Sequence, residues 1–184
     1  ELIRARDLYI THDADIALTG ATAGSPGIIV IAGTGSMAFG RSSQGRSARA
    51  GGWGYVFGDE GGGFDIARRA LRAVLRMEEG WGPATALHRA LLGATRSTDA
   101  DTRMHRLYTS EFSRPEIAAL SPLVTDAAES GDIVASEILR EAAAGLSVYV
   151  EGVHRNLFTT EPCASICYIG GVFRSEPLRA CFQH

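Results

Sequence analysis

The chain has 184 residues, of which 45% are hydrophobic and 21% charged, and its formal net charge at pH 7 is −3. These values fit a soluble globular protein of one large domain or one and a half small ones, and the negative charge argues against a general nucleic-acid binder. All 18 basic residues are arginine, which excludes a P-loop of the GxxxxGK[ST] type because that motif requires lysine.

The cysteines and the apolar segments give no sign of a metal site or a membrane anchor. Cys163 and Cys167 have a CxxxC spacing with no second Cys or His cluster beside them, and Cys181 stands apart. No apolar run approaches the ~20 residues that cross a bilayer, and no signal peptide opens the chain. We therefore expect small apolar cysteines around a buried strand, no membrane partner and a reducing, cytoplasmic setting.

The first quarter of the chain contains the strongest strand signal. A short strand is predicted at residues 8–11, followed by a helix over 14–20 with Asp13 as its N-cap. Residues 27–32 (GIIVIA) are uniformly apolar and β-branched, as is typical of a strand buried on both faces. A second strand at 37–40 is predicted to pair back on it, ahead of a polar hairpin tip.

Helical periodicity begins at residue 65, where apolar side chains recur every three or four positions with arginines on the opposite face. The strands and helices together indicate an α/β fold with a mixed sheet and flanking helices. Ligands of such folds bind at the carboxyl ends of strands. The first of these helices is predicted to run from residue 65 to a Gly-Pro break at 80–83. Further helices are predicted at 85–92, 101–110, 115–130, 133–158 and 177–182, and a last strand at 164–169.

Two glycine turns directly follow predicted strands. Residues 33–36 (GTGS) expose backbone N–H groups and two hydroxyls, a combination that favours an anion such as phosphate. Gly170 and Gly171 would let a flat ligand lie close to the backbone. The alternative for residues 33–36 is a tight hairpin turn without a ligand. The alternative for Gly170 and Gly171 is a helix-capping turn without a ligand.

Acidic residues accompany these turns. Asp13 lies at a predicted strand end, where a carboxylate can accept the proton of an attacking hydroxyl; the alternative is a plain helix N-cap. Asp59 and Glu60, flanked by glycines, could hold sugar hydroxyls or hydrated Mg²⁺, or form a solvated acidic turn. Trp53 could pack on a sugar face or anchor its loop to the core.

Taken together, five motifs resemble the BadF/BadG-type ATPase family, with the closest likeness to its N-acetylglucosamine kinases. This family belongs to the superfamily of actin-like ATPases, sugar kinases and Hsp70. The motifs cover nearly the whole chain and are DxxxAL at 13–18, IAGTGS at 31–36, GGWG at 51–54, GDEG at 58–61 and GGVF at 170–173.

The resemblance implies a ribonuclease-H-like lobe of a two-lobed kinase. That kinase would use ATP and Mg²⁺ to phosphorylate a hydroxyl of N-acetylglucosamine or a related amino sugar. Its roles by residue are Asp13 as catalytic base, Gly33, Thr34, Gly35 and Ser36 as second phosphate loop, Gly170 and Gly171 as adenosine loop, and Thr34, Gly52, Asp59 and Glu60 as sugar-binding residues.

Two departures from the family pattern limit this interpretation. No acidic glycine-rich phosphate loop of the DGGGTKT kind is present, so residues 1–184 are expected to be the second lobe, cut at both ends and self-associating through its exposed face. Met37 stands where N-acetylglucosamine kinases can carry a sugar-binding Asn, which leaves the exact sugar open. The alternatives are an ATPase that energises a partner protein, for which the cysteines lack the iron–sulfur pattern, and an inactive sugar-binding fragment.

Overall fold

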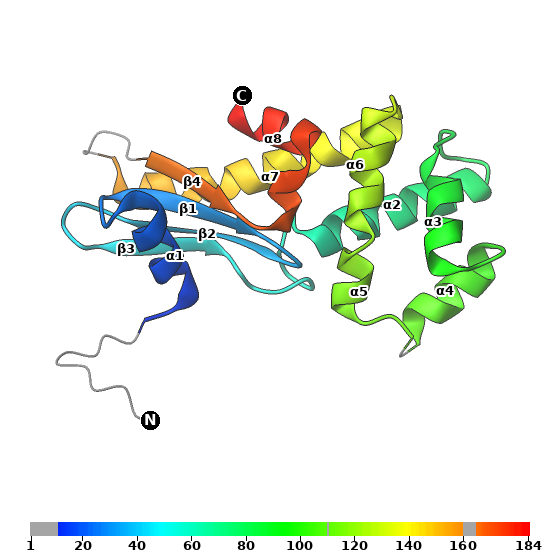
Figure 1. The fold of residues 1–184 in the computed structure, drawn as a ribbon, viewed down its shortest axis with the longest axis horizontal. Helices are drawn as coiled ribbons and strands as arrows, with labels where there is room; N and C mark the ends of the chain where they lie inside the picture. The colour runs from blue at the N-terminus through cyan, green and yellow to red at the C-terminus, as the bar shows by residue number, and fades with distance from the viewer. Residues whose placement is uncertain (1–10, 110, 160–164) are drawn as a thin grey trace.

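The structure is a computed structural model that describes residues 11–109, 111–159 and 165–184. Its sheet has four strands in the order β3-β2-β1-β4 (Figure 1). The central strand β1 pairs antiparallel with β2 and parallel with β4, and β2 pairs antiparallel with β3. The predicted α/β class and mixed sheet are therefore confirmed. The strands are β1 (Gly27–Ala32), β2 (Ser36–Arg41), β3 (Ser47–Gly51) and β4 (Ser165–Ile169).

Helices cover both faces of this sheet, which explains why its central strand is apolar throughout. The long helix α7 (Ile133–Leu157) packs on the face that carries Ile28 and Val30. Helix α1 (Asp13–Thr22) packs on the other face, against Ile29 and Phe39. Successive strand residues thus point into two separate cores, as the alternation of side chains in a strand requires.

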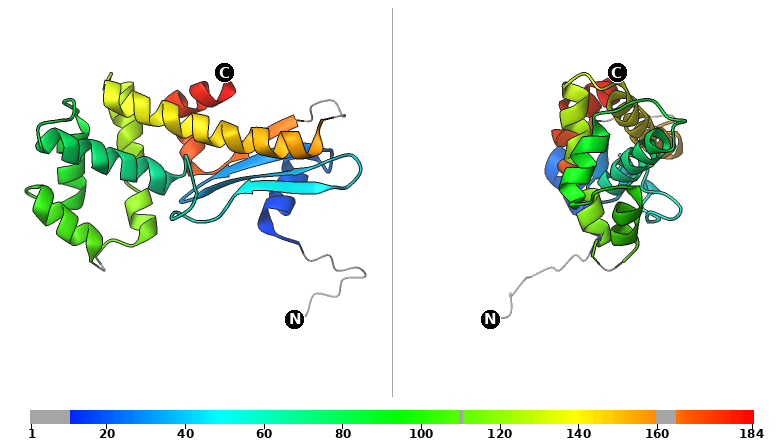
Figure 2. Two further views of the ribbon diagram at one scale, coloured as in Figure 1. Left: turned by 180° about the vertical axis from the view of Figure 1, so that it is seen from behind. Right: turned by 90° about the vertical axis from the view of Figure 1, so that its right-hand side faces the viewer.

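Helices α2 to α6 extend beyond one end of the sheet, whereas α8 lies beside α7 (Figures 1 and 2). Helix α2 leads into this region, and the chain then returns to the sheet edge through α5 and α6. The helices are α2 (Gly63–Glu78), α3 (Leu87–Thr95), α4 (Ala100–Tyr108), α5 (Arg114–Ala118) and α6 (Ser121–Glu129), with η1 (Gly171–Arg174) and α8 (Glu176–Gln183) after β4.

Three sequence predictions need correction. The N-cap of α1 is His12, whose Nδ1 accepts the N–H of Asp15 at 3.2 Å, and Asp13 is instead the first helical residue. The helix predicted over 115–130 is two helices, because Pro122 has no N–H to donate to the Ala118 carbonyl and its ring would clash with that carbonyl in a continuous helix. Strand β3 (SARAG) was missed, since it carries small and polar residues in place of β-branched ones.

Part of the predicted first strand (residues 8–10) and Cys163 lie outside the described residues. The prediction that the cysteines surround a buried strand is wrong for the other two, since Cys181 is exposed and Cys167 is half-buried in β4, whose other residues are exposed. Among the helices that are described, none combines the length and the apolarity needed to cross a membrane.

Candidate functional site

The 33–36 turn is held against the start of α2. The N–H of Gly63 donates to the carbonyl of Gly33 at 2.8 Å, and the N–H of Phe64 donates to that of Thr34 at 3.0 Å. The first amides of α2 therefore bind the turn and cannot serve an anion directly. Within the described residues, the N–H groups of Thr34 and Gly35 have no protein acceptor, which leaves two successive donors of the kind that form an anion nest.

The parallel pairing of β1 and β4 brings the two glycine turns to the same edge of the sheet. The register places Ile31 opposite Ile169, so residues 33–34 and 170–171 follow side by side. Gly170 packs against β1: a Cβ there would lie 2.1 Å from the carbonyl oxygen of Ala32, and its φ is +122°.

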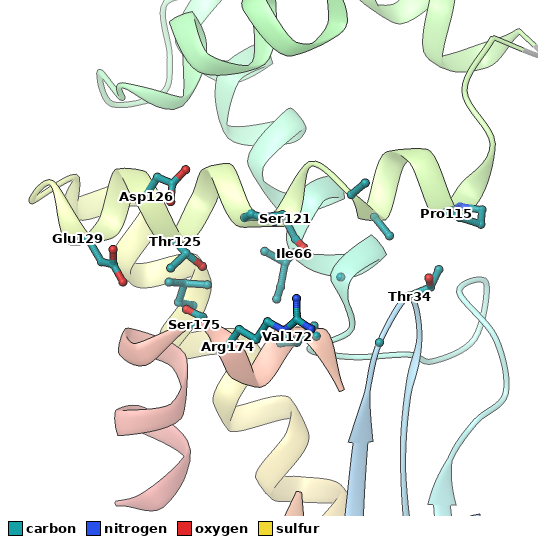
Figure 3. Close-up of a pocket in the computed structure, with 17 residues that line it drawn as sticks. Thr34, Ile66, Pro115, Ser121, Thr125, Asp126, Glu129, Val172, Arg174 and Ser175 are labelled. Atoms are coloured by element: carbon teal, nitrogen blue, oxygen red, sulfur yellow. The ribbon is translucent and has the colours of Figure 1, made fainter. Parts of the chain in front are cut away.

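A cavity of about 680 Å³ opens between these turns, the start of α2 and helices α5 and α6 (Figure 3). Figure 3 shows Thr34 at the tip of its turn, with Arg174 of η1 and the side chains of α6 across the cavity. Gly33 and Gly171 both line it, and a Cβ on either would meet no protein atom within 4 Å. This volume lies in the range of small-molecule sites.

Much of the cavity wall comes from residues that carry no recognisable motif. Arg174 supplies a guanidinium with no ion-pair partner in the described part of the chain. The other lining residues without a motif belong to α5 and α6, and they reach the cavity only because these helices return to the sheet edge. The sequence pattern does not predict that return. These residues include Pro115, Ala118, Ser121, Thr125, Asp126 and Glu129.

Asp59 lies behind the 33–36 turn with only 4% of its surface exposed. One carboxylate oxygen accepts the N–H of Ser36 at 3.3 Å, and the other is ion-paired with Arg114 from the start of α5. A Cβ at Gly35 would lie 2.4 Å from Asp59 Oδ2, so this glycine allows the carboxylate to approach the turn. Arg114 also lies 5.1 Å above the ring of Tyr55.

Glu60 is held by α7. Its backbone N–H donates to the hydroxyl of Tyr149 at 3.2 Å, and that hydroxyl in turn donates to the Glu60 carboxylate. The Glu60 carbonyl accepts the hydroxyl of Ser36 at 2.7 Å. Gly35 and Ser36 thus bind the acidic loop, residues 58–61, whereas Gly33 and Thr34 line the cavity.

Asp65, in the first turn of α2, fixes the end of the acidic loop. Its carboxylate accepts the N–H of Gly61 at 3.1 Å and forms ion pairs with Arg68 and Arg69 at 2.7 and 2.9 Å. Burial acts to raise the pKa of Asp65, but the hydrogen bonds from Gly61, Arg68 and Arg69 outweigh it and leave the pKa below its usual 3.8.

The other predicted sugar-binding position lies on the side of the sheet where α1 packs. Gly52 donates its N–H to the carbonyl of Ser36 at 3.0 Å, and a Cβ there would lie 3.4 Å from the Met37 side chain. Trp53 is 67% exposed, with the guanidinium of Arg49 4.6 Å from its ring centre. The alternative in which Trp53 anchors its loop to the core is therefore wrong.

Asp13 lies apart from the cavity lining. It is exposed at the start of α1, and its carboxylate accepts the N–H of Ala14 at 2.8 Å. The neighbouring His12 contacts the ring of Phe39 edge-on, with the ring centres 4.5 Å apart. The described residues contain no group of three or more His, Cys, Asp or Glu side chains that could hold a metal ion.

Comparison with known proteins places these features in a family context. The sequence profile of the BadF/BadG/BcrA/BcrD ATPase family matches residues 1–184. The chain is 38% identical over 168 residues to the N-acetylmuramic acid/N-acetylglucosamine kinase of Clostridium acetobutylicum, covering 91% of this chain and 55% of that protein. It is 34% identical over 165 residues to the N-acetyl-D-glucosamine kinase of Dictyostelium discoideum, with 88% and 52% covered. The chain thus spans about half the length of these curated relatives.

Solved structures agree with this placement. A protein of Chromobacterium violaceum assigned as an N-acetylglucosamine kinase superposes with a TM-score of 0.77 at 30% identity, covering 92% of this chain and 55% of that one. A ROK family glucokinase from Streptomyces griseus, solved with glucose and AMPPNP, gives a TM-score of 0.51 at 17% identity, covering 86% and 50%, and supports the fold alone.

Proposed function

Because the chain belongs to the BadF/BadG/BcrA/BcrD ATPase family, we propose that it is part of an ATP-dependent kinase that phosphorylates a hydroxyl of an amino sugar. N-acetylglucosamine is the first substrate to test, since it occurs in the names of the relatives from Clostridium and Dictyostelium. The observation that carries the proposal is the cavity at the carboxyl ends of β1 and β4, where two glycine turns meet. Ligands of α/β folds bind at this edge.

In this proposal the cavity binds ATP. The N–H groups of Thr34 and Gly35 and the guanidinium of Arg174 are suited to phosphate oxygens, because they are donors with no protein acceptor in the described residues. Gly33 and Gly171 leave space at the cavity wall for the nucleotide to approach the backbone. The whole proposed nucleotide-binding set is Gly33, Thr34, Gly35, Ser36, Gly170 and Gly171. In this set Ser36 and Gly170 act by shaping the turns, and Gly35 both offers its N–H and leaves room for the Asp59 carboxylate behind the turn.

The sugar is proposed to bind near Thr34, Gly52 and the acidic loop with Asp59 and Glu60. Both oxygens of Asp59 accept hydrogen bonds from protein groups, so a sugar hydroxyl must compete with Arg114 for this carboxylate. Asp13 is proposed to take the proton of the attacking hydroxyl. Its support is geometric and chemical: the Asp13 carboxylate is exposed in the first turn of α1, where a substrate hydroxyl can reach it.

Mg²⁺ enters the proposal only as part of the nucleotide complex. Mg²⁺ in kinase sites is held by substrate phosphates and waters with one or two carboxylates. The described residues contain no group of three or more His, Cys, Asp or Glu side chains that could hold the ion without the nucleotide.

The direct test is transfer of phosphate from ATP to N-acetylglucosamine by the full-length protein. Asp13→Ala should lower the transfer rate by about 100- to 10,000-fold, the usual contribution of a general base, and leave nucleotide affinity unchanged. Asp101→Ala is the matched control, since Asp101 is also an exposed acid in the first turn of a helix, α4. Unchanged transfer in Asp13→Ala would contradict the catalytic role.

A second function within the family is an ATPase that energises a partner protein. Hydrolysis of ATP at equal rates with and without the sugar would favour that function over the kinase. Cytoplasmic localisation and a homodimer remain further proposals, which fractionation and light scattering would test.

A further inference from the structure

A second cavity lies between α2 and α7, away from the glycine turns. It has a volume of about 520 Å³, and we call it the α2–α7 groove. Figure 2 shows α2 and α7 side by side in this part of the molecule, and the two helices pack together. The residues that matter here are Arg69, Arg72 and Arg76 of α2 and Ile133, Val134 and Ile138 of α7.

The groove has an apolar floor. Ile138 is buried, Val134 and Ala73 are half-buried, and Ile133 is 84% exposed at the N-terminal end of α7. An isoleucine this exposed beside a concave apolar surface offers contact area to a ligand with an apolar body.

The charged rim of the groove has an excess of unpaired positive charge. Its two carboxylates are occupied: Glu141 is ion-paired with Arg69, and both oxygens of Glu137 bind Arg140, which lies outside the groove. Arg72 has no hydrogen bond or ion pair within the described ranges.

Arg76 also lacks a carboxylate partner in the described part of the chain. Its guanidinium lies 5.0 Å from the ring centre of Trp81. Arg72 and Arg76 are four residues apart on one helix, so they project from the same side on successive turns. Two neighbouring unpaired guanidiniums are suited to an anion that carries close to two negative charges.

We propose that the α2–α7 groove binds a small organic monophosphate, with its phosphate on Arg72 and Arg76 and its apolar body on Val134 and Ile138. Binding there goes beyond the kinase function and can be measured without turnover. It also has a route to the acidic loop, because Arg69 of the groove binds Asp65, which accepts the N–H of Gly61. Arg69 lies one turn before Arg72 on α2, so a phosphate bound at Arg72 should perturb the Arg69–Asp65 ion pair and with it the environment of the Gly61 amide.

Titration of ¹⁵N-labelled protein with phenyl phosphate, followed by NMR, tests both statements. The chain has two tryptophans, and the indole N–H of Trp81 reports on the groove. We expect saturable shifts of the Trp81 indole and the Gly61 amide with a common midpoint. Inorganic phosphate and phenol, which each supply one half of the ligand, should bind more weakly by about tenfold or more.

The double variant Arg72→Gln/Arg76→Gln should weaken phenyl phosphate by about tenfold or more, since each charge-assisted hydrogen bond contributes at that scale. Both side chains are exposed, so the fold should persist. Arg155→Gln is the control, because Arg155 is an exposed arginine at the far end of α7, and it should leave the affinity unchanged.

Three results would overturn the site: no saturable Trp81 shift, equal affinity in the double variant, or equal weakening by Arg155→Gln. A Gly61 amide that stays unshifted while Trp81 saturates would overturn the link to the acidic loop. Loss of kinase activity in Asp13→Ala bears on neither statement, so the two proposals fail separately.

Discussion

The open wall of the cavity and the packed layer behind it use glycine in opposite ways, although each of the two glycine turns contributes one residue to both. At the cavity, Gly33 and Gly171 face open space. In the layer behind it, Gly35 and Gly170 are pressed against protein atoms, the carboxylate of Asp59 and the backbone of β1. Glycine density alone therefore does not identify a ligand site, because one of the two glycines in each turn is required by internal packing. Alanine at Gly170, Gly171 and Gly33 separates these two uses, and substitutions at Arg114 and Asp65 test the packing of the acidic loop behind the cavity.

The largest effect is expected for Gly170→Ala. Its φ of +122° is unfavourable for alanine, and the new Cβ would lie 2.1 Å from the Ala32 carbonyl oxygen. Together these should destabilise the protein by about 3 kcal/mol or more, measured by urea unfolding. Gly171→Ala is the matched control and should change stability by less than about 1 kcal/mol. Equal losses in the two variants would remove the distinction between the packed and the open glycine.

The next effect concerns the partner of Asp59. Arg114→Met should lower the free energy of unfolding by about 3 kcal/mol at pH 7, because it leaves a buried carboxylate without its counter-charge. Arg155→Met breaks an exposed ion pair with Glu151 and should cost less than about 1 kcal/mol. Urea unfolding of both variants at pH 7 measures the difference. Equal losses of unfolding free energy would contradict a special role for the Arg114–Asp59 ion pair.

A smaller effect is expected in the pH dependence of stability. Because the folded-state pKa of Asp65 is lowered, its carboxylate contributes stability that is fully present above its usual pKa of 3.8. That contribution is lost as the pH falls from there through the lowered pKa. Asp65→Asn should therefore flatten the acid side of the stability profile below the usual pKa of 3.8. An acid profile parallel to that of the unsubstituted protein would contradict the assigned hydrogen bonds.

Sequence patterns predicted those parts of the fold that rest on local signals. GIIVIA is the buried central strand, the amphipathic segment after residue 132 is α7, and two glycine turns do meet at one sheet edge. Sequence patterns failed where the strand signal was weak, as in SARAG, or where two neighbouring residues could both cap a helix, as with His12 and Asp13. SARAG pairs with β2 because of its place after a hairpin, and His12 took the capping position because its ring nitrogen can accept the N–H of Asp15.

The candidate site was predictable as a set of turns but not as a cavity. No motif marks α5 and α6, which close one wall, or Arg174 in η1. The burial of Asp59 by Arg114 joins residues 55 positions apart, which a linear pattern does not show. The predicted sugar-binding acid consequently lies with both oxygens bound to protein groups, and Asp13 lies apart from the cavity lining.

The central claim is that the open glycines Gly33 and Gly171 face a nucleotide. Calorimetric titration of AMPPNP into the full-length protein and its Gly33→Ala and Gly171→Ala variants tests this directly. We expect each variant to bind AMPPNP about tenfold or more weakly, because the added methyl group occupies ligand space. The free energies of unfolding should stay within about 1 kcal/mol of that of the unsubstituted protein. AMPPNP affinity unchanged in both variants would contradict the claim.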